Sequence, residues 1–392
     1  MSTRRLYASA VTGEVSPLEV GYRRGVGADW NPAERQRYAR HMLLPDFGED
    51  GQRRLRAGRV LIVGAGGLGS PASLYLAAAG VGSIRLVDFD AVDETNLQRQ
   101  ILYDAADVGR PKLAAAAERL RRLNPLIDVQ VHDGPFALEN ARELVTGADV
   151  VIDGSDNFAT RYLVNDACVL CHVPNVYGSV FRFEGQAAVF AAPGGPCYRC
   201  LHPEPPPDGL IPSCAEAGVL GVLPGVIGTI QATEAIKLLA GVGTSLIGRL
   251  LLYDAWRMRI REIALPRDPA CPVCGDRPSI RELVAIESRA CATQGMTPDM
   301  TVEELKKWRA DGTPHVLIDV REPSEHAMAS IEGAVLIPLG TLQDRLSEVP
   351  TDRPVVVHCR SGARSARAVA MLRAEGINAH NLVGGILAWD GQ

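Results

Sequence analysis

Residues 59–70, Arg-Val-Leu-Ile-Val-Gly-Ala-Gly-Gly-Leu-Gly-Ser, decide the fold of the chain. The apolar run at the start predicts a buried strand, and the pattern from Ser70 to Ala79 predicts a helix. Glycines between them let the backbone approach a phosphate, while N–H groups at the start of the helix supply positive potential. We assign four glycines to this phosphate-binding turn: Gly64, Gly66, Gly67 and Gly69.

The next predicted strand, residues 83–88, ends in a carboxylate. Asp88 lies about 20 residues beyond the glycine turn, where a carboxylate can accept hydrogen bonds from ribose hydroxyls. The same combination is typical of NAD-dependent dehydrogenases. The glycine turn and Asp88 alone therefore fit a dinucleotide as well as a mononucleotide.

Polar residues beyond this strand favour a triphosphate. Arg99 and Lys112 supply two cations, and a leaving pyrophosphate needs its charge neutralised. Asp156 follows a predicted buried strand over residues 149–153 and is a candidate ligand of Mg²⁺. The polar residues that we assign to the nucleotide site are Asp88, Asp90, Asn96, Arg99, Lys112, Asp156 and Asn157.

Strands and helices alternate along most of the chain, in two parts. Apolar runs between residues 59 and 265 alternate with helical stretches, which predicts a mostly parallel α/β sheet with helices on both faces. A smaller α/β unit follows, and a capping box at Thr301 starts one of its helices. We expect four segments: an N-terminal extension over 1–29, a first domain over 30–275, a linker over 276–298 and a second domain over 299–392.

Charge and composition exclude several classes of function. The 392 residues contain 41 Lys and Arg against 46 Asp and Glu, a net charge of −5. Binding to nucleic acid is not expected, because neutralising phosphates requires a basic excess. No apolar run approaches the roughly 20 residues of a membrane span, and the first residues lack the apolar core of a secretory signal. We expect a cytoplasmic protein with no membrane partner.

Nine cysteines in such a chain favour metal binding or thiol chemistry over disulfides. Two Cys-x-x-Cys pairs are the strongest metal candidate, since each pair can turn both sulfurs toward one tetrahedral ion. Two unrelated thiol pairs are the alternative. The four candidate zinc ligands are Cys197, Cys200, Cys271 and Cys274. A third pair, Cys168 and Cys171, falls inside a predicted helix and is interpreted as small core residues.

Two single cysteines are candidate nucleophiles. Cys214 follows a proline-rich loop in a glycine-rich segment, and loops of this kind can carry a nucleophile to an adenylate. Cys359 lies between a predicted strand and a helix, in His-Cys-Arg-Ser-Gly-Ala-Arg-Ser over residues 358–365. Loop N–H groups, the helix N-terminus and two arginines, Arg364 among them, favour a thiolate there. Such a thiolate can accept a sulfane sulfur as a persulfide.

The loop after Cys359 resembles that of rhodanese-type sulfurtransferases. Four residues stand between Cys359 and Arg364, and cysteine phosphatases have a longer loop. The shorter loop suits one sulfur atom better than a phosphate. Three further segments match the rhodanese pattern: residues 317–322, 331–338 and 384–389. The sequence departs from that pattern at Ile331 and Glu332, where a histidine is usual before the Gly-Ala element.

Residues 30–275 resemble the MoeB/ThiF family, the prokaryotic relatives of ubiquitin-activating enzymes. The matching segments are residues 37–40, 64–70, 88–90, 96–100, 112, 156–157 and 177–185. The resemblance implies a Rossmann-like adenylation domain that uses ATP to adenylate the C-terminal glycine of a small ubiquitin-like sulfur carrier protein ending in Gly-Gly.

The resemblance also implies roles for individual residues. The glycine turn would bind phosphates, Asp88 the ribose, Arg99 and Lys112 the triphosphate, and Asp156 Mg²⁺. Arg40 would reach the phosphates bound by a partner subunit, which implies a homodimer. Zinc on the four-cysteine set would be structural. Cys214 resembles the cysteine that takes the activated carrier as a thioester or acyl disulfide.

The order of the two units, which resembles the MoeZ-type (MoeBR) architecture, predicts a function in two steps. The first unit would make an acyl-adenylate, and the second would bring sulfur as a Cys359 persulfide. A cysteine desulfurase or thiosulfate would supply that sulfur. Two other classes stay open: a NAD-dependent oxidoreductase with a sulfurtransferase tail, and a scaffold that binds the carrier without turnover.

Overall fold

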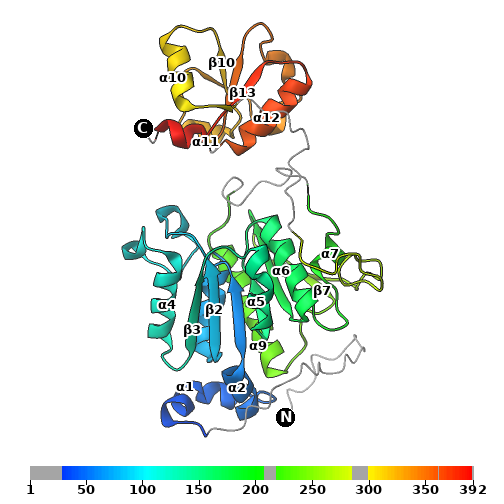
Figure 1. Cartoon of the computed structure of the whole chain (residues 1–392). Helices are drawn as coiled ribbons and strands as arrows, with labels where there is room; N and C mark the ends of the chain where they lie inside the picture. Colours follow the sequence, from blue (N-terminus) through cyan, green and yellow to red (C-terminus); the bar gives the residue numbers. More distant parts are fainter. Residues whose placement is uncertain (1–28, 207–217, 285–298, 361, 391–392) are drawn as a thin grey trace. The chain divides into compact units, whose positions relative to one another are not determined.

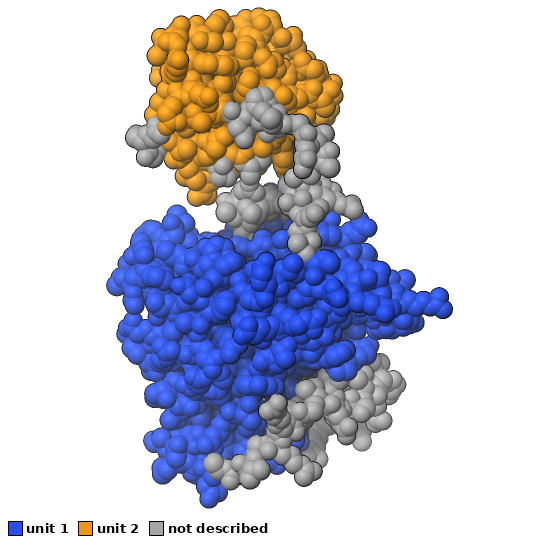
Figure 2. All heavy atoms as spheres, in the orientation of Figure 1, with its two compact units in different colours: residues 1–206, 212–287 blue, residues 207–211, 288–392 orange. Residues whose placement is uncertain are grey.

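The computed structural model of the chain describes residues 29–206, 218–284, 299–360 and 362–390, which form two compact units (Figures 1 and 2). The described part of the first unit covers residues 29–206 and 218–284, and that of the second covers the residues from 299 onward. Most of the expected N-terminal extension, 1–29, and of the expected linker, 276–298, lies outside the described residues.

An eight-stranded mixed sheet forms the centre of the first unit, in the order β3-β2-β1-β4-β5-β6-β7-β8. Its strands are β1 (Arg59–Val63), β2 (Ser83–Asp88), β3 (Asp128–Asp133), β4 (Val150–Asp153), β5 (Asn175–Phe181), β6 (Glu184–Phe190), β7 (Arg249–Asp254) and β8 (Arg259–Ala264). Strands β3, β2, β1, β4 and β5 are parallel, and β6 to β8 continue the sheet antiparallel. The mostly parallel α/β sheet expected from the sequence is confirmed.

Helices cover both faces of this sheet (Figure 1). They are α1 (Pro32–Met42), α2 (Gly48–Ala57), α3 (Gly69–Ala79), α4 (Lys112–Leu123), α5 (Leu138–Thr146), α6 (Phe158–Cys171), α7 (Tyr198–Leu201) and α9 (Val222–Ala240). Val60 and Ile62 of β1 pack with α3, α4 and α9, whereas Leu61 and Val63 pack with α5 and α6. Successive side chains of a strand point to opposite faces, so a strand buried on both sides is continuously apolar.

Helix α9 is an apolar core helix. Among the described residues, it is the one helix long and apolar enough to cross a membrane by length and composition alone, and 56% of that window is buried. It packs against α3 and against strands β5 and β6. We expected no apolar run long enough for a membrane span, and residues 222–240 are an exception by length and composition. The structure packs this helix into the core of the first unit.

The second unit has a five-stranded parallel sheet in the order β11-β10-β12-β13-β9. Its strands are β9 (Asp299–Met300), β10 (Val316–Asp319), β11 (Ala334–Leu336), β12 (Val355–His358) and β13 (Ala379–Leu382). Its helices are α10 (Val302–Ala310), α11 (Pro323–Met328), α12 (Ala363–Ala374) and α13 (Gly385–Asp390). The predicted capping box at Thr301 is confirmed, because its hydroxyl accepts a hydrogen bond from Glu304 N at the start of α10.

In each sheet, successive strands are first added on one side of a central strand and then on its other side. In the first unit, β1 lies between β2 and β4, and in the second, β10 lies between β11 and β12. Loops that leave the carboxyl ends of such neighbouring strands diverge, which opens a crevice suited to ligands. The glycine turn follows β1 and Cys359 follows β12. Both candidate sites therefore occupy the position in the sheet where α/β proteins bind their ligands.

Gln231 ties α9 to the end of the sheet that carries the glycine turn. Its buried Nε2 donates hydrogen bonds to Asp153 O (2.8 Å) and Val176 O (2.9 Å). Replacing Gln231 by Ala leaves both carbonyls without this donor, and we expect the free energy of unfolding to fall by about 1–3 kcal/mol. Urea unfolding measures the loss. The exposed Thr233→Ala on the same helix is the control, and an equal loss in both variants would contradict the assignment.

Candidate functional sites

The glycine turn packs tightly against the chain segment that follows β4. Gly64 has φ +90°, and a Cβ there would lie 2.8 Å from the carbonyl oxygen of Gly154. A Cβ at Gly69, the first residue of α3, would lie 1.9 Å from Gly64 O. No side chain in the described part of the chain caps α3. The turn thus brings bare backbone and an uncapped helix N-terminus together, an arrangement that binds anions.

Asp88 joins the end of β2 to this turn. Its half-buried carboxylate accepts hydrogen bonds from the backbone N–H groups of Ala65 (2.8 Å), Phe89 (2.8 Å) and Asp90 (2.9 Å). An ionised carboxylate has about four acceptor positions, so three backbone bonds leave room for one further donor. The carboxylate is held rigidly beside the turn and keeps the capacity to accept a hydroxyl.

Lys112 is a buried cation at the start of α4. Its side chain is only 5% exposed, and its Nζ donates to Asp90 Oδ2 at 2.8 Å. The backbone N–H of Lys112 also donates to Asp90 O at 2.9 Å. An ammonium has three donors, so this pair leaves others for an anion. Asp90 therefore orients the lysine.

Arg99 and Gln100 lie over the glycine turn. A Cβ placed at Gly67 would lie 3.6 Å from Arg99 Cδ, and one at Gly66 would lie 3.6 Å from Gln100 Nε2. Asn96 Oδ1 accepts hydrogen bonds from Arg99 Nη2 (3.0 Å) and Gln100 Nε2 (3.1 Å). Asn96 thus holds a partly buried guanidinium beside the turn. The sequence predicted Asn96 and Arg99 but missed Gln100.

The remaining predicted nucleotide residues are exposed. Asp156 follows β4, and Asn157 caps α6 by accepting a hydrogen bond from Thr160 N at 2.9 Å. Arg40 lies on the exposed side of α1. No hydrogen bond or ion pair among the described residues connects Arg40 to the turn, so within one chain it stands apart from the other candidates.

Two buried charged residues behind Asp156 were not predicted. Asp153 is fully buried at the end of β4, and burial raises the pKa of its carboxyl against the opposing charge of Arg161. Arg161 Nη2 donates to Ser155 O at 2.9 Å and so braces the loop that carries Asp156. Arg161 shares a helix face with Val164 and Cys168, both in the core. The spacing of Arg161 from these two core residues was the sequence signal that could have predicted its burial.

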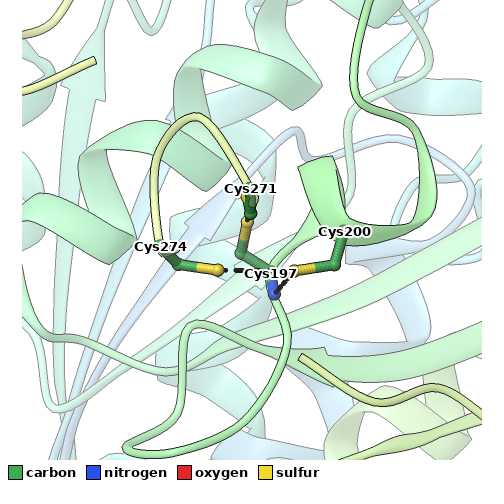
Figure 3. Close-up of side chains that lie close together, drawn as sticks. All are labelled: Cys197, Cys200, Cys271 and Cys274. Atoms are coloured by element: carbon green, nitrogen blue, oxygen red, sulfur yellow. Dashed lines mark hydrogen bonds between the residues drawn. The ribbon is translucent and has the colours of Figure 1, made fainter. Parts of the chain in front are cut away.

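Four sulfurs converge from two distant segments (Figure 3). Cys197 and Cys200 lie at α7, and Cys271 and Cys274 lie in a loop after β8. All four sulfurs fall within 4.8 Å of one another, with 3.5 Å between those of Cys197 and Cys271 and 3.3 Å between those of Cys200 and Cys274. Zn–S bonds of about 2.3 Å give tetrahedral edges of about 3.8 Å, so the cluster can hold zinc.

Hydrogen bonds among the four sulfurs shift the thiols in opposite directions. The hydrogen bond with Cys197 lowers the pKa of Cys200 to about 6 and lowers that of Cys271, whereas hydrogen bonds within the cluster raise the pKa of Cys197 and of Cys274. Asp268 N donates to Cys200 Sγ at 3.4 Å, which stabilises charge on that sulfur. Metal ligands must be deprotonated, so a bound cation would take all four sulfurs as thiolates. In contrast, Cys168 is buried in α6 as expected, and burial raises its pKa well above the ordinary value.

Cys359 is buried in the loop between β12 and α12. Its Sγ accepts hydrogen bonds from Gly362 N at 3.2 Å and from the Ser365 hydroxyl at 3.5 Å. Gly362, with φ +99°, adopts the left-handed conformation that turns its N–H toward the sulfur. The geometry fits the predicted anion-binding loop.

Arg364 forms an ion pair with Glu325, a residue that we did not predict from the sequence. Its Nη1 and Nη2 donate to the two carboxylate oxygens of Glu325, each at 2.7 Å. We expected Arg364 to add positive charge near Cys359, but the carboxylate of Glu325 neutralises that charge. Cys214, the other candidate nucleophile, lies outside the described residues.

Two family models match the chain. The ThiF family matches residues 38–273, and the rhodanese-like domain matches residues 301–392. Among solved structures, Escherichia coli MccB with ATP is similar in fold, with a TM-score of 0.56 and 23% identity over 62% of this chain and 75% of that one. The large unit therefore shares the fold of MccB.

Curated relatives span both units. The Mycobacterium tuberculosis "probable adenylyltransferase/sulfurtransferase MoeZ" is 49% identical over 90% of this chain and 92% of its own length. The Mus musculus "adenylyltransferase and sulfurtransferase MOCS3" is 39% identical over 99% and 93%. The Thermus thermophilus "sulfur carrier protein adenylyltransferase" is 52% identical over 66% and 97%. The chain therefore belongs to the ThiF family and is an enzyme of the adenylyltransferase and sulfurtransferase kind, with a rhodanese-like domain after its ThiF domain.

Proposed function

We propose that this enzyme uses ATP to adenylate the C-terminal glycine of a small ubiquitin-like sulfur carrier protein and then converts that end to a thiocarboxylate with sulfur from Cys359. The observation that carries the proposal is that one chain joins a ThiF-family unit to a rhodanese-like unit. Relatives of the same architecture are named for both activities. Joining the units on one chain raises the effective concentration of the sulfur donor for the second step.

Adenylation needs positioning and charge neutralisation rather than a covalent enzyme residue. The carrier's terminal carboxylate attacks the α-phosphorus of ATP, and pyrophosphate leaves. We assign the glycine turn to the phosphates, Asp88 to the ribose, and Arg99 and Lys112 to the departing pyrophosphate. The hydrogen bonds from Arg99 to Asn96 and from Lys112 to Asp90 support these roles, because they hold Arg99 over the turn and Lys112 beside the residue that follows Asp88 by two positions.

Asp156 would hold Mg²⁺ in this proposal. Its carboxylate is exposed just beyond β4, and hard oxygen ligands suit the ion. When bound, the ion neutralises triphosphate charge. Arg40 would complete the nucleotide site of a partner subunit in a homodimer. Its exposure on α1, apart from the turn of its own chain, supports that role.

Sulfur transfer would begin at Cys359. Its thiolate takes a sulfane sulfur from a donor to become a persulfide, whose terminal sulfur attacks the carbonyl carbon of the acyl-adenylate and displaces AMP, which leaves the carrier as an acyl disulfide on Cys359. A second thiolate then attacks Sγ of Cys359, the S–S bond to the carrier breaks and the thiocarboxylate leaves. The disulfide that remains on Cys359 is reduced by a further thiol. The hydrogen bonds from Gly362 N and Ser365 to Sγ support an anionic sulfur there. We assign Cys214 as the thiol that takes the activated carrier as a thioester or acyl disulfide.

Removing Arg99 tests the nucleotide half. We expect Arg99→Ala to lower carrier-dependent ATP–pyrophosphate exchange by about 100-fold, since one charge-stabilising donor is lost. Arg119→Ala, which removes an exposed arginine from α4, should retain near-normal exchange. Calorimetric titration with ATP and with NADH distinguishes the proposed adenylation from the oxidoreductase alternative, which requires binding of NADH. Tight NADH binding, or equal exchange in both variants, would refute the assignment.

Removing Cys359 tests the sulfur half. Cys359→Ala should retain ATP–pyrophosphate exchange, because the nucleotide site lies in the other unit, but it should form no thiocarboxylate. Mass spectrometry of the carrier measures the product, and intact-mass analysis of the enzyme measures the added sulfur. Cys171→Ser is the control thiol. Persistent thiocarboxylate in Cys359→Ala would place the sulfur-accepting thiol elsewhere.

The four-cysteine cluster gives a metal prediction. We expect about one zinc per chain, because four thiolates complete one tetrahedral site. Cys271→Ser should lose the metal and lower the melting temperature of the first unit, whereas Cys171→Ser should keep both. Elemental analysis and thermal unfolding measure the two effects. Full zinc content in Cys271→Ser would show that the metal binds elsewhere.

A further inference from the structure

Two arginines are buried in the described part of the second unit, Arg321 and Arg364, and each is paired with a carboxylate. The Arg364–Glu325 pair is bidentate, with side chains only 10% and 19% exposed. Arg321 donates from Nε and Nη2 to Asp319, with side chains 4% and 0% exposed. Bidentate, partly buried pairs of this kind fix the guanidinium firmly.

The neighbouring titratable groups do not restore positive charge. Burial acts to raise the pKa of Glu325, but the hydrogen bond from Arg364 more than offsets it, so that the net pKa is lowered and the carboxylate is ionised at neutral pH. Burial lowers the pKa of His358, which is therefore neutral there. His326 Nδ1 lies 2.9 Å from Asp319 Oδ2 and is occupied by that carboxylate.

Cys359 is consequently surrounded by dipoles more than by free charge. The described hydrogen bonds to its Sγ come from the Gly362 N–H and the Ser365 hydroxyl, both neutral. Arg360, the remaining arginine of the loop, is exposed, where water screens its charge. One sulfur with a single negative charge suits such surroundings. A small dianion suits them less, because it must shed its water where the described buried arginines are already paired with carboxylates.

We propose that Glu325 sets the sulfur-donor specificity of the rhodanese-like domain by holding Arg364 away from the donor, which disfavours small dianionic donors such as thiosulfate and favours a persulfide carried on a protein thiol. This inference rests on the proposed function of Cys359. Glu325 is a specificity-determining residue that acts through Arg364.

The transferred group is the same for both donors. The Cys359 thiolate attacks the outer sulfur, the donor's S–S bond breaks, and a new S–S bond leaves Cys359 as a persulfide anion. A protein persulfide departs as a thiolate, and thiosulfate departs as sulfite. Only the reaction with thiosulfate brings a donor with two negative charges to Cys359 and leaves two on the departing group. The preference between the two donors therefore depends on whether the positive charge of Arg364 can interact with the donor.

The full-length protein with Glu325→Gln tests the inference. The amide keeps an oxygen for the capping contact with Glu322 N but loses the charge that holds Arg364. With thiosulfate and cyanide as substrates, we expect kcat/KM for thiosulfate to rise about tenfold, mainly through a lower KM, as when one charge-assisted hydrogen bond is gained. With a cysteine desulfurase and L-cysteine as donor, persulfide formation on Cys359 should not accelerate.

Two matched variants separate charge from structure. Glu325→Asp keeps the carboxylate and should keep thiosulfate use low. Glu322→Gln removes the same charge from the start of the same helix, and its side chain makes no described contact with Arg364, so it should behave as the unchanged protein. Melting temperatures establish that each variant is folded.

Unchanged or lower thiosulfate kcat/KM in folded Glu325→Gln would overturn the inference, and so would an equal rise in Glu322→Gln. Failure of the proposed function looks different. In that case Cys359 of the unchanged protein would acquire no sulfur from either donor, although ATP–pyrophosphate exchange could persist. The two results are therefore distinguishable in one set of samples.

Discussion

The close approach of backbone to backbone at the ends of β1 and β4 is the constraint on which the nucleotide site depends. A Cβ at Gly64 would lie 2.8 Å from Gly154 O, and a Cβ at Gly69 would lie 1.9 Å from Gly64 O, so neither position accepts a side chain. Gly154 N also donates to Val63 O at 2.9 Å, which locks the two strand ends together. Asp88, Asn96 and the loop before α6 are all arranged around this contact. A side chain there would displace the whole anion-binding turn.

The two candidate sites treat charge in opposite ways. In the first unit, Asp90 and Asn96 hold Lys112 and Arg99 beside the glycine turn with donors to spare, which suits a substrate with several negative charges. In the second unit, Arg321 and Arg364 are paired with carboxylates, and Cys359 accepts hydrogen bonds from a backbone N–H and a hydroxyl. The same type of sheet end thus serves a polyanion in one unit and a single sulfur in the other.

Local patterns explain what the sequence could predict. The glycine turn, the capping box at Thr301 and the Cys-x-x-Cys pairs are each encoded within a few residues, and the structure forms the turn and the box and brings the sulfurs together. Long-range pairing has no such signature. Glu325 and Arg364 are 39 residues apart, so neither predicts the other. Arg161 was missed because a helical pattern does not show that a charge on the apolar face will reach a carbonyl such as that of Ser155.

The cysteine cluster has a consequence for chain entropy. A metal ion bound there would cross-link residue 200 to residue 271 and close a loop that contains α9, β7 and β8. In the chain-entropy model, closing a loop of roughly 70 residues removes freedom from the unfolded chain worth about 4 kcal/mol. The antiparallel half of the sheet would then assemble as a tethered lobe. Its folding would follow the supply of metal, and because α9 packs against α3 and bonds to β4 and β5 through Gln231, loss of the metal would also weaken the packing of the parallel half.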